Sequence, residues 1–97
     1  MTNFVLINPF EVPEDMDDDR FLESWGRAAA YMRSRPGFVS SELHRAVSPN
    51  SRFRFVNVAE WETAQDFQAA VRNPEFQAMA ADAPPNYPAL YEVVRAF

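Results

Sequence analysis

Two hydrophobic patterns alternate along the chain and predict its secondary structure. Short runs in which alternate positions are apolar are typical of strands, and apolar residues three or four positions apart are typical of helices. Strands are expected at residues 3–10, 38–47, 52–61 and 90–96. Helices are expected at residues 18–35, 63–73 and 74–81. If the last two helices count as one unit, the order is β-α-β-β-α-β.

Local signals at the helix ends agree with this pattern. The acidic run at residues 14–19 precedes the first helix, where negative charge opposes the positive end of the helix dipole. A cation site is the alternative, but these carboxylates lack the spacing of a calcium loop. Pro36 and Gly37 end the same helix, and Asn73 followed by Pro74 is typical of an N-cap with proline in the first turn.

This order predicts the α+β ferredoxin-like fold, in which a four-stranded antiparallel sheet carries both helical segments on one face. A chain of 97 residues makes a single domain, residues 1–97. The other sheet face would then be apolar and uncovered, which favours a partner. We therefore expect a homodimer packed sheet to sheet. The apolar residues assigned to that face are Val5, Ile7, Leu43, Val56 and Val58.

The turn composition of residues 48–51 predicts a hairpin between the second and third strands. If these four residues alone close the hairpin, His44 lies opposite Phe55 and Glu42 lies opposite Asn57. Directly opposed residues share a sheet face, so all four would point the same way. A slip of one residue would move every side chain of a strand to the other face.

This register predicts an aromatic-walled pocket between the sheet and the helices. Its polar groups would be His44, Glu42, Asn57 and Asn8, with Trp61 pointing the same way. A plain core would avoid such groups, because burying each one unpaired costs about 1–3 kcal/mol. One interpretation is a ligand pocket with a few orienting polar groups. The other is that the histidine and glutamate pair near a sheet end while the asparagines bond loop backbone.

The composition excludes most other kinds of catalytic and binding site. With no Cys, one His and two Gly, the chain cannot build disulfides, thiolate zinc sites, His-rich metal sites or glycine-rich phosphate loops. All nine basic residues are Arg, which excludes lysine Schiff bases. A net charge of −5 argues against a nucleic-acid partner. The chain shows neither a signal peptide nor an apolar run of membrane-spanning length, so we expect a cytoplasmic protein without a membrane partner.

Four segments together resemble the antibiotic biosynthesis monooxygenase family. They are residues 5–13, 35–39, 55–61 and 73–76, with the sequences VLINPFEVP, RPGFV, FVNVAEW and NPEF. The resemblance implies a dimeric α+β barrel of ferredoxin-like fold with a pocket between sheet and helices. It also implies, by analogy with some members, cofactor-independent oxidation of an anthrone or phenolic polyketide to a quinone with O2.

The resemblance extends to particular residues. In that group an Asn and a Trp four residues apart contact the substrate, and Asn57 and Trp61 match them. A Tyr expected six residues after the Trp is Phe67 here, and an Arg expected near Ala81 has no counterpart. These two departures concern the substrate and the path of its proton.

A second branch of similar fold binds and degrades heme. It uses an Asn on the first strand, which Asn8 matches, and a Trp and a His around the second helix. At those two positions this chain has Ala70 and Ala80, which argues against heme degradation.

We therefore expect a cofactor-independent monooxygenase for a phenolic or anthrone-type polyketide, with O2 as the second substrate and no cofactor. His44 would accept or orient a proton with the help of Glu42, because imidazole titrates near neutral pH. The expected catalytic residues are His44, Asn57 and Trp61, and the expected substrate-binding residues are Asn8, Trp25, Glu42, Phe55 and Phe67. The alternatives are a non-oxidative ligand-binding or cyclase-like protein, a heme-binding relative, and a purely structural or regulatory dimer.

Overall fold

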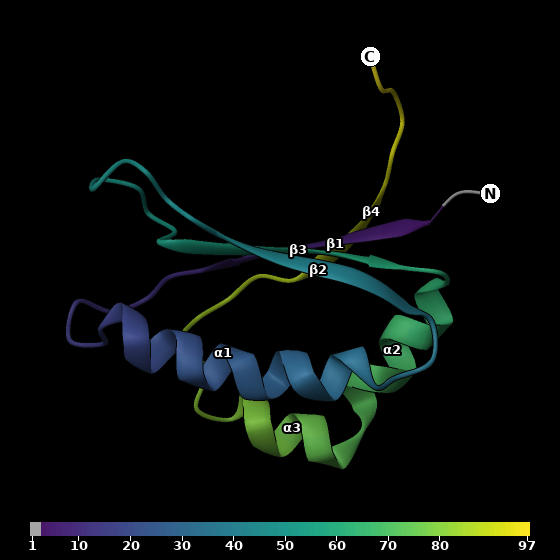
Figure 1. Cartoon of the computed structure of the whole chain (residues 1–97), viewed down its shortest axis with the longest axis horizontal. Coiled ribbons are helices and arrows are strands. Elements are labelled where there is room, and N and C mark those ends of the chain that lie inside the picture. Colours follow the sequence, from purple (N-terminus) through teal and green to yellow (C-terminus); the bar gives the residue numbers. More distant parts are fainter. Residues whose placement is uncertain (1–2) are drawn as a thin grey trace.

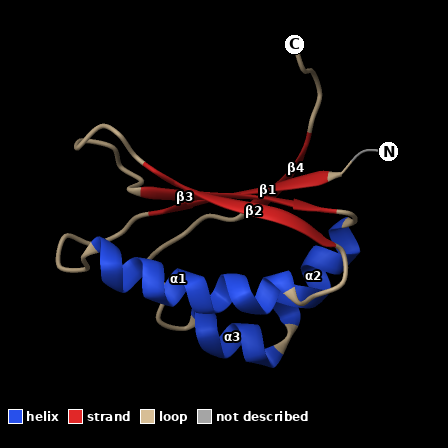
Figure 2. Cartoon of the chain, in the orientation of Figure 1, coloured by secondary structure: helices blue, strands red, loops and turns tan. Residues whose placement is uncertain are grey.

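A four-stranded antiparallel sheet with all its helices on one face makes up the computed structural model, which describes residues 3–97 (Figures 1 and 2). Its elements are β1 (Phe4–Phe10), α1 (Asp18–Arg33), β2 (Phe38–Arg45), β3 (Phe55–Trp61), α2 (Ala64–Arg72), α3 (Pro74–Ala80) and β4 (Ala89–Glu92). The strand order β2-β3-β1-β4 confirms the expected ferredoxin-like fold. Within residues 3–97, no helix is long and apolar enough to cross a membrane.

The strands are shorter than predicted at four ends. β1 begins one residue late, at Phe4. β2 stops at Arg45 and β3 starts at Phe55, so the loop between them is longer than the predicted turn. β4 ends at Glu92, and the chain beyond it leaves the sheet on the side away from the helices (Figure 1).

Side-chain caps hold the start of each helix, as the sequence indicates. The Asp17 carboxylate accepts a hydrogen bond from the backbone N–H of Arg20 at 2.8 Å, ahead of α1. The Thr63 hydroxyl caps α2, and the Asn73 side chain caps α3. The acidic run therefore serves as the first turn of α1 and its cap, and the described residues contain no group of three or more His, Cys, Asp or Glu able to hold a metal ion.

Two buried clusters account for much of the aromatic content. In the first, Phe21 of α1 stacks on Phe55 of β3 at 4.5 Å between ring centroids, and its edge meets Phe10 of β1 at 5.0 Å. The second surrounds Trp61, which is 1% exposed and packs with Leu6, Ala59 and Ala70. Both clusters join the sheet to the helices, so the space between the two layers has a fixed width.

β2 and β3 pair one residue away from the predicted register. Phe38 opposes Trp61 as predicted, but an irregularity between Phe38 and Ser40 leaves Val39 outside the pairing. Beyond this bulge Leu43 opposes Asn57 and His44 opposes Val56, so the predicted pairs are wrong along the rest of the hairpin.

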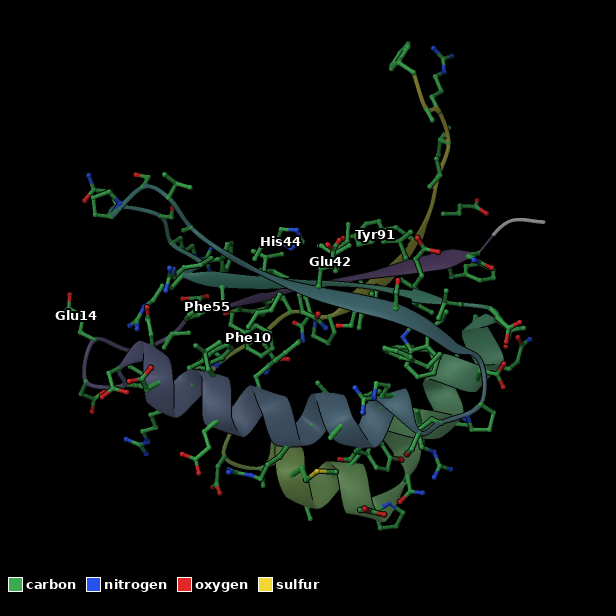
Figure 3. All side chains as sticks on the ribbon, viewed as in Figure 1. Phe10, Glu14, Glu42, His44, Phe55 and Tyr91 are labelled. Carbon is green, nitrogen blue, oxygen red and sulfur yellow. The ribbon has the colours of Figure 1, made fainter. Side chains whose placement is uncertain are left out.

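The bulge exchanges the two faces of β2. Glu42 and His44 are exposed and point away from the helices, on the same side of the sheet as Tyr91 (Figure 3). Leu43 instead packs against the buried cluster of Phe10 and Phe55 on the helix side, so its assignment to the outer face is also wrong.

The hairpin loop explains why a four-residue turn fails to predict this register. Arg54 turns inward and its guanidinium donates to the backbone oxygens of Val12, Pro13 and Met16 and to the Asp18 carboxylate, at 2.9–3.3 Å. These bonds fasten the hairpin loop to the segment between β1 and α1. Residues 48–51 do form a tight turn, in which the Ser51 N–H donates to the Ser48 oxygen at 3.3 Å. The strands close only further out, where the Ala46 N–H donates to the Arg54 oxygen at 2.8 Å.

Gly37 fixes the start of β2. It has a φ of +85°, which side-chain-bearing residues rarely adopt, and its carbonyl accepts from the N–H of Glu62 at 2.8 Å. A Cβ at this position would also overlap the carboxylate of Asp66.

Replacing each glycine by alanine should give opposite results. Gly37→Ala should lower the free energy of unfolding by about 1–2 kcal/mol, because of the left-handed backbone and the overlap with Asp66. Gly26→Ala should raise it by about 0.5–1 kcal/mol, because Gly26 lies inside α1 with open space around it. Urea denaturation followed by circular dichroism measures both changes, and equal effects would contradict this account of Gly37.

Candidate functional site

A cavity of about 290 Å³ lies between the sheet and the helices. This volume is at the lower end of the range for small-molecule sites. The sheet supplies one wall, and the opposite walls come from the helices and from the loop between α3 and β4. Most of the lining is apolar or aromatic, including Trp25, Met32, Phe38, Phe67, Phe76 and Met79.

The polar lining of this cavity is entirely neutral. None of the residues that line it has a side chain that ionises near pH 7. Its asparagine and serine residues are Asn8, Ser24, Ser41, Asn57 and Asn86. The cavity therefore lacks both a general base and a cation for an anionic ligand, and hydrogen bonds must do the orienting.

The amide oxygen of Asn57, a residue of the cavity lining, is bonded by a neighbouring hydroxyl. Ser41 Oγ donates to Asn57 Oδ1 at 2.8 Å. Ser41 lies on this face because of the bulge, which places it opposite Ala59 on β3. With its oxygen engaged, Asn57 has Nδ2 left to donate to a ligand.

Two polar atoms of the cavity residues are buried and have no hydrogen-bond partner in the protein. They are the Asn8 carbonyl oxygen, Oδ1, and the Trp61 indole nitrogen, Nε1. The Trp61 ring is held edge to face by Phe38 and Phe67, at 5.5 and 5.6 Å between centroids. Each of these atoms has less than 1 Å² of accessible surface, so neither faces the open space of the cavity.

The structure brings together five of the residues that the sequence selects. They line one cavity and are Asn8, Trp25, Asn57, Trp61 and Phe67. Phe55 lies behind the wall, stacked on Phe21, and does not line the cavity.

His44 and Glu42 lie on the opposite face of the sheet, as Figure 3 shows. Their predicted place in the pocket is wrong, because the bulge shifts the pairing by one residue and turns both side chains outward. His44 cannot accept a proton from a ligand in this cavity.

The sequence prediction misses three polar residues of the cavity, Ser24, Ser41 and Asn86. Ser41 could not be found without the bulge, since the predicted register turns it outward. Asn86 stands among prolines, at residues 84–88, a composition that indicates only a loop.

The loop that carries Asn86 is fastened to the end of β1. The N–H of Glu11, the residue after β1, donates to the Pro85 oxygen at 2.8 Å. The Tyr87 N–H donates to the oxygen of Pro9 in β1 at 3.2 Å. On the outside, the Tyr87 hydroxyl donates to the Glu11 carboxylate. Arg52 donates to the same carboxylate at 2.8 Å. These three residues, Glu11, Arg52 and Tyr87, form a clamp that holds the loop against the end of β1.

The clamp changes the acidity of its members. The hydrogen bond from Tyr87, followed by that from Arg52, lowers the pKa of Glu11 because both stabilise the carboxylate. The bond to Glu11 raises the pKa of Tyr87, because the phenol must keep its proton in order to donate.

The residues present do not suit a heme ligand. The chain has one His, and it lies on the outer face. Ala80 lines the cavity and Ala70 is buried beside Trp61, so neither position that the resemblance to the heme branch singles out supplies an imidazole or an indole.

The clamp should make stability depend on pH through Glu11. The folded-state pKa of Glu11 is lowered from its unfolded-state value near 4.5. The stabilisation that Glu11 gives to the folded protein is therefore complete at pH values above the unfolded-state pKa, and it is lost as the pH falls through the folded-state pKa. Glu11→Gln should therefore be less stable than the wild type at pH 7, and this difference should shrink at more acidic pH. Urea denaturation between pH 7 and pH 3 measures it, with the exposed Glu14→Gln as control. A difference that does not change with pH would contradict the role of the carboxylate.

The comparisons with known proteins agree with this architecture. The sequence model of the family described as antibiotic biosynthesis monooxygenase matches residues 3–82. The search of curated proteins finds no match. A crystal structure from Shewanella loihica PV-4, described as a "putative monooxygenase", is 33% identical, with 99% of each chain covered and a TM-score of 0.85.

Two more distant structures share the fold. SnoaB, a cofactor-independent oxygenase from Streptomyces nogalater, solved as an asparagine-to-alanine mutant, is 23% identical, with 97% of this chain and 95% of that chain covered and a TM-score of 0.82. A dimeric ferredoxin-like protein of unknown function from Thermobifida fusca is 12% identical, with 95% and 92% covered and a TM-score of 0.73. Since the family model spans most of its length, the chain belongs to the antibiotic biosynthesis monooxygenase family.

Proposed function

We propose that the protein is a cofactor-independent monooxygenase that oxidises a phenolic or anthrone-type aromatic polyketide with O2. The observation that carries the proposal is the neutral, aromatic cavity whose lining includes Asn8, Asn57 and Trp61. Family membership and the overall likeness to a cofactor-independent oxygenase support it.

The reaction balances without a cofactor. The methylene carbon of an anthrone loses two hydrogens and gains one oxygen atom, and the second oxygen atom leaves as water. Once the substrate has lost a proton, its electron-rich anion passes an electron to O2, the two radicals combine, and the resulting hydroperoxide loses water to give the ketone. The protein needs to bind the substrate, stabilise its negative oxygen and exclude bulk water.

The cavity residues supply these three contributions. Asn57 Nδ2 is a hydrogen-bond donor for an oxygen that becomes negative, because Ser41 already bonds Asn57 Oδ1. The aromatic side chains hold the rings of the substrate in a slot with little room for water. Since no lining residue ionises near neutral pH, no side chain of the cavity takes the proton, and the pKa of the substrate sets the pH dependence of the rate.

Oxidation of dithranol, a 1,8-dihydroxyanthrone, tests the proposal. Asn57→Ala should lower kcat/KM by about 10- to 100-fold, because it removes a donor to the developing oxyanion. His44→Ala should stay within about twofold of the wild type, because His44 lies outside the cavity and leaves its donors intact. An oxygen electrode measures the rate, and circular dichroism checks that each variant folds.

The outcome of the dithranol experiment separates the candidate functions. If dithranol is oxidised no faster with the wild-type protein than without it, the result would contradict the proposed monooxygenase activity. Binding without oxygen consumption would favour the non-oxidative alternative, a ligand-binding or cyclase-like protein that uses the same cavity. Loss of activity in His44→Ala would contradict the assignment of the cavity as the site.

We also propose that the protein is a homodimer packed through the outer face of the sheet. That face carries the half-buried apolar side chains Val5, Ile7, Val56 and Val58. Tyr91, 52% exposed, extends it on β4. The helices cover only the other face, and the dimeric relative from Thermobifida fusca has the same fold.

Val58→Arg should convert the dimer into a monomer, because it places a charge in the middle of the apolar face. Light scattering should give twice the chain mass of 11.1 kDa for the wild type at micromolar concentration and that mass for the variant. Val47→Arg, fully exposed in the hairpin loop, is the control and should remain a dimer. A measured mass of 11.1 kDa for the wild-type protein under these conditions would contradict the proposed dimer.

A further inference from the structure

We propose that ligands enter the cavity through a groove between α1 and β2, and that Trp25 is the side chain that opens and closes this entrance. The inference rests on the proposed function only in taking the cavity to be a ligand site. It goes further in naming the route by which a ligand reaches the cavity and the residue that controls the rate of entry.

The groove runs along the surface where α1 meets β2. Gly26, Ala30 and Arg33 of α1 line one side, and Val39 and Ser40 of β2 line the other. β2 is an edge strand, so within residues 3–97 no further strand pairs with it on this side of the sheet (Figure 1). The bulge leaves Val39 outside the pairing and 46% exposed, and this residue helps to form the β2 side of the groove.

Four residues line both the groove and the cavity and therefore separate them. They are Trp25 and Ala29 of α1, and Phe38 and Ser41 of β2. Because the alanine and serine side chains are small, the two aromatic rings make up most of this partition. A ligand in the groove is thus one layer of side chains away from the cavity.

Of the two rings in the partition, Trp25 is the one that is free to move. Phe38 is held edge to face against the buried Trp61, at 5.5 Å between ring centroids. Trp25 is half-buried at the margin of the cluster around Phe21, and no hydrogen bond within residues 3–97 holds its indole. A change of rotamer at Trp25 would join the groove to the cavity.

The contacts around the cavity leave this side free to open. α1 and β2 are joined at the two ends of the groove, by the ion pair of Asp18 with Arg45 at 3.3 Å and by the turn of residues 34–37. Between these ends, the described residues form no hydrogen bond from α1 to β2. At the opposite edge of the sheet, backbone bonds and the clamp hold the loop between α3 and β4 against β1. Entry there would break these bonds, whereas entry through the groove breaks none.

The binding kinetics of N-phenyl-1-naphthylamine, a neutral three-ring aromatic amine, test the entrance. Its fluorescence rises in apolar surroundings, so stopped-flow mixing under argon gives the rate constants of association and dissociation, and their ratio gives Kd. Gly26→Phe fills the groove without touching the cavity, because Gly26 lines only the groove and a Cβ there meets open space. Both rate constants should fall about tenfold while Kd stays within about twofold of the wild type, since an obstructed path raises the barrier and leaves the free and bound states unchanged.

Three further variants separate the entrance from general effects on α1. Ala30→Phe, exposed in the same groove and outside the cavity lining, should repeat the effect of Gly26→Phe. Gly26→Ala is the matched control: it also replaces the glycine inside α1 but does not fill the groove, and it should keep both wild-type rate constants. Trp25→Ala removes the gate and should raise the association rate constant about fivefold. If Trp25 were only a wall of the cavity, its loss would raise the dissociation rate constant alone.

Two variants outside the groove locate the probe and test the other route. Ala80→Phe fills part of the cavity and should raise Kd about tenfold, because it takes space from the ligand. Ala81→Phe lies on the exposed start of the loop between α3 and β4 and should leave both rate constants unchanged.

The inference is overturned if Gly26→Phe and Ala30→Phe keep the wild-type rate constants, if Ala81→Phe slows entry instead, or if Trp25→Ala does not speed association. It is also overturned if the probe does not bind or if Ala80→Phe leaves its Kd unchanged, because the groove would then not lead aromatic ligands to the cavity. The probe is not oxidised under argon, so these outcomes are independent of dithranol oxidation. Slower entry in Gly26→Phe without oxygen consumption by the wild type would uphold the entrance and overturn the monooxygenase, and the reverse result would do the opposite.

Discussion

The alternation of side chains along a strand is the constraint on which the site depends, and a single bulge resets it. Between Phe38 and Ser40 one residue leaves the pairing of β2 with β3. Every later side chain of β2 therefore changes face: Ser41 enters the cavity, while His44 leaves it. A shift of one residue thus converts a pocket with an ionisable group into a neutral one.

The neutrality of the cavity decides what chemistry the protein can contribute. Without a base or a cation, the polar lining consists of neutral groups that bond to one another in pairs: Ser41 to Asn57, and Asn8 to Asn86. Such a site suits a substrate that is reactive once deprotonated and needs orientation and protection from water. The absence of charge also favours an aromatic ligand with few ionised groups.

The aromatic residues fall into two sets with different structural roles. Phe21 and Phe55 stack between α1 and β3 and set the distance between the layers; Phe21 also borders the cavity, whereas Phe55 supports it from behind. Trp25 and Phe67 form its wall. Residue type alone could not separate these sets, because a buried ring that fills space and one that borders an empty space follow the same spacing along a helix or strand.

The sequence by itself determined the order of elements, the helix caps, the ferredoxin-like topology and the face of β1 and β3 on which Asn8, Asn57 and Trp61 lie, because periodicity and capping are local properties. Only the tertiary structure decided the register of β2, since the bulge depends on how Gly37 and the hairpin loop are held by distant segments. It also decided the place of Asn86, which a proline-rich loop brings beside β1 through backbone contacts between residues far apart in the chain.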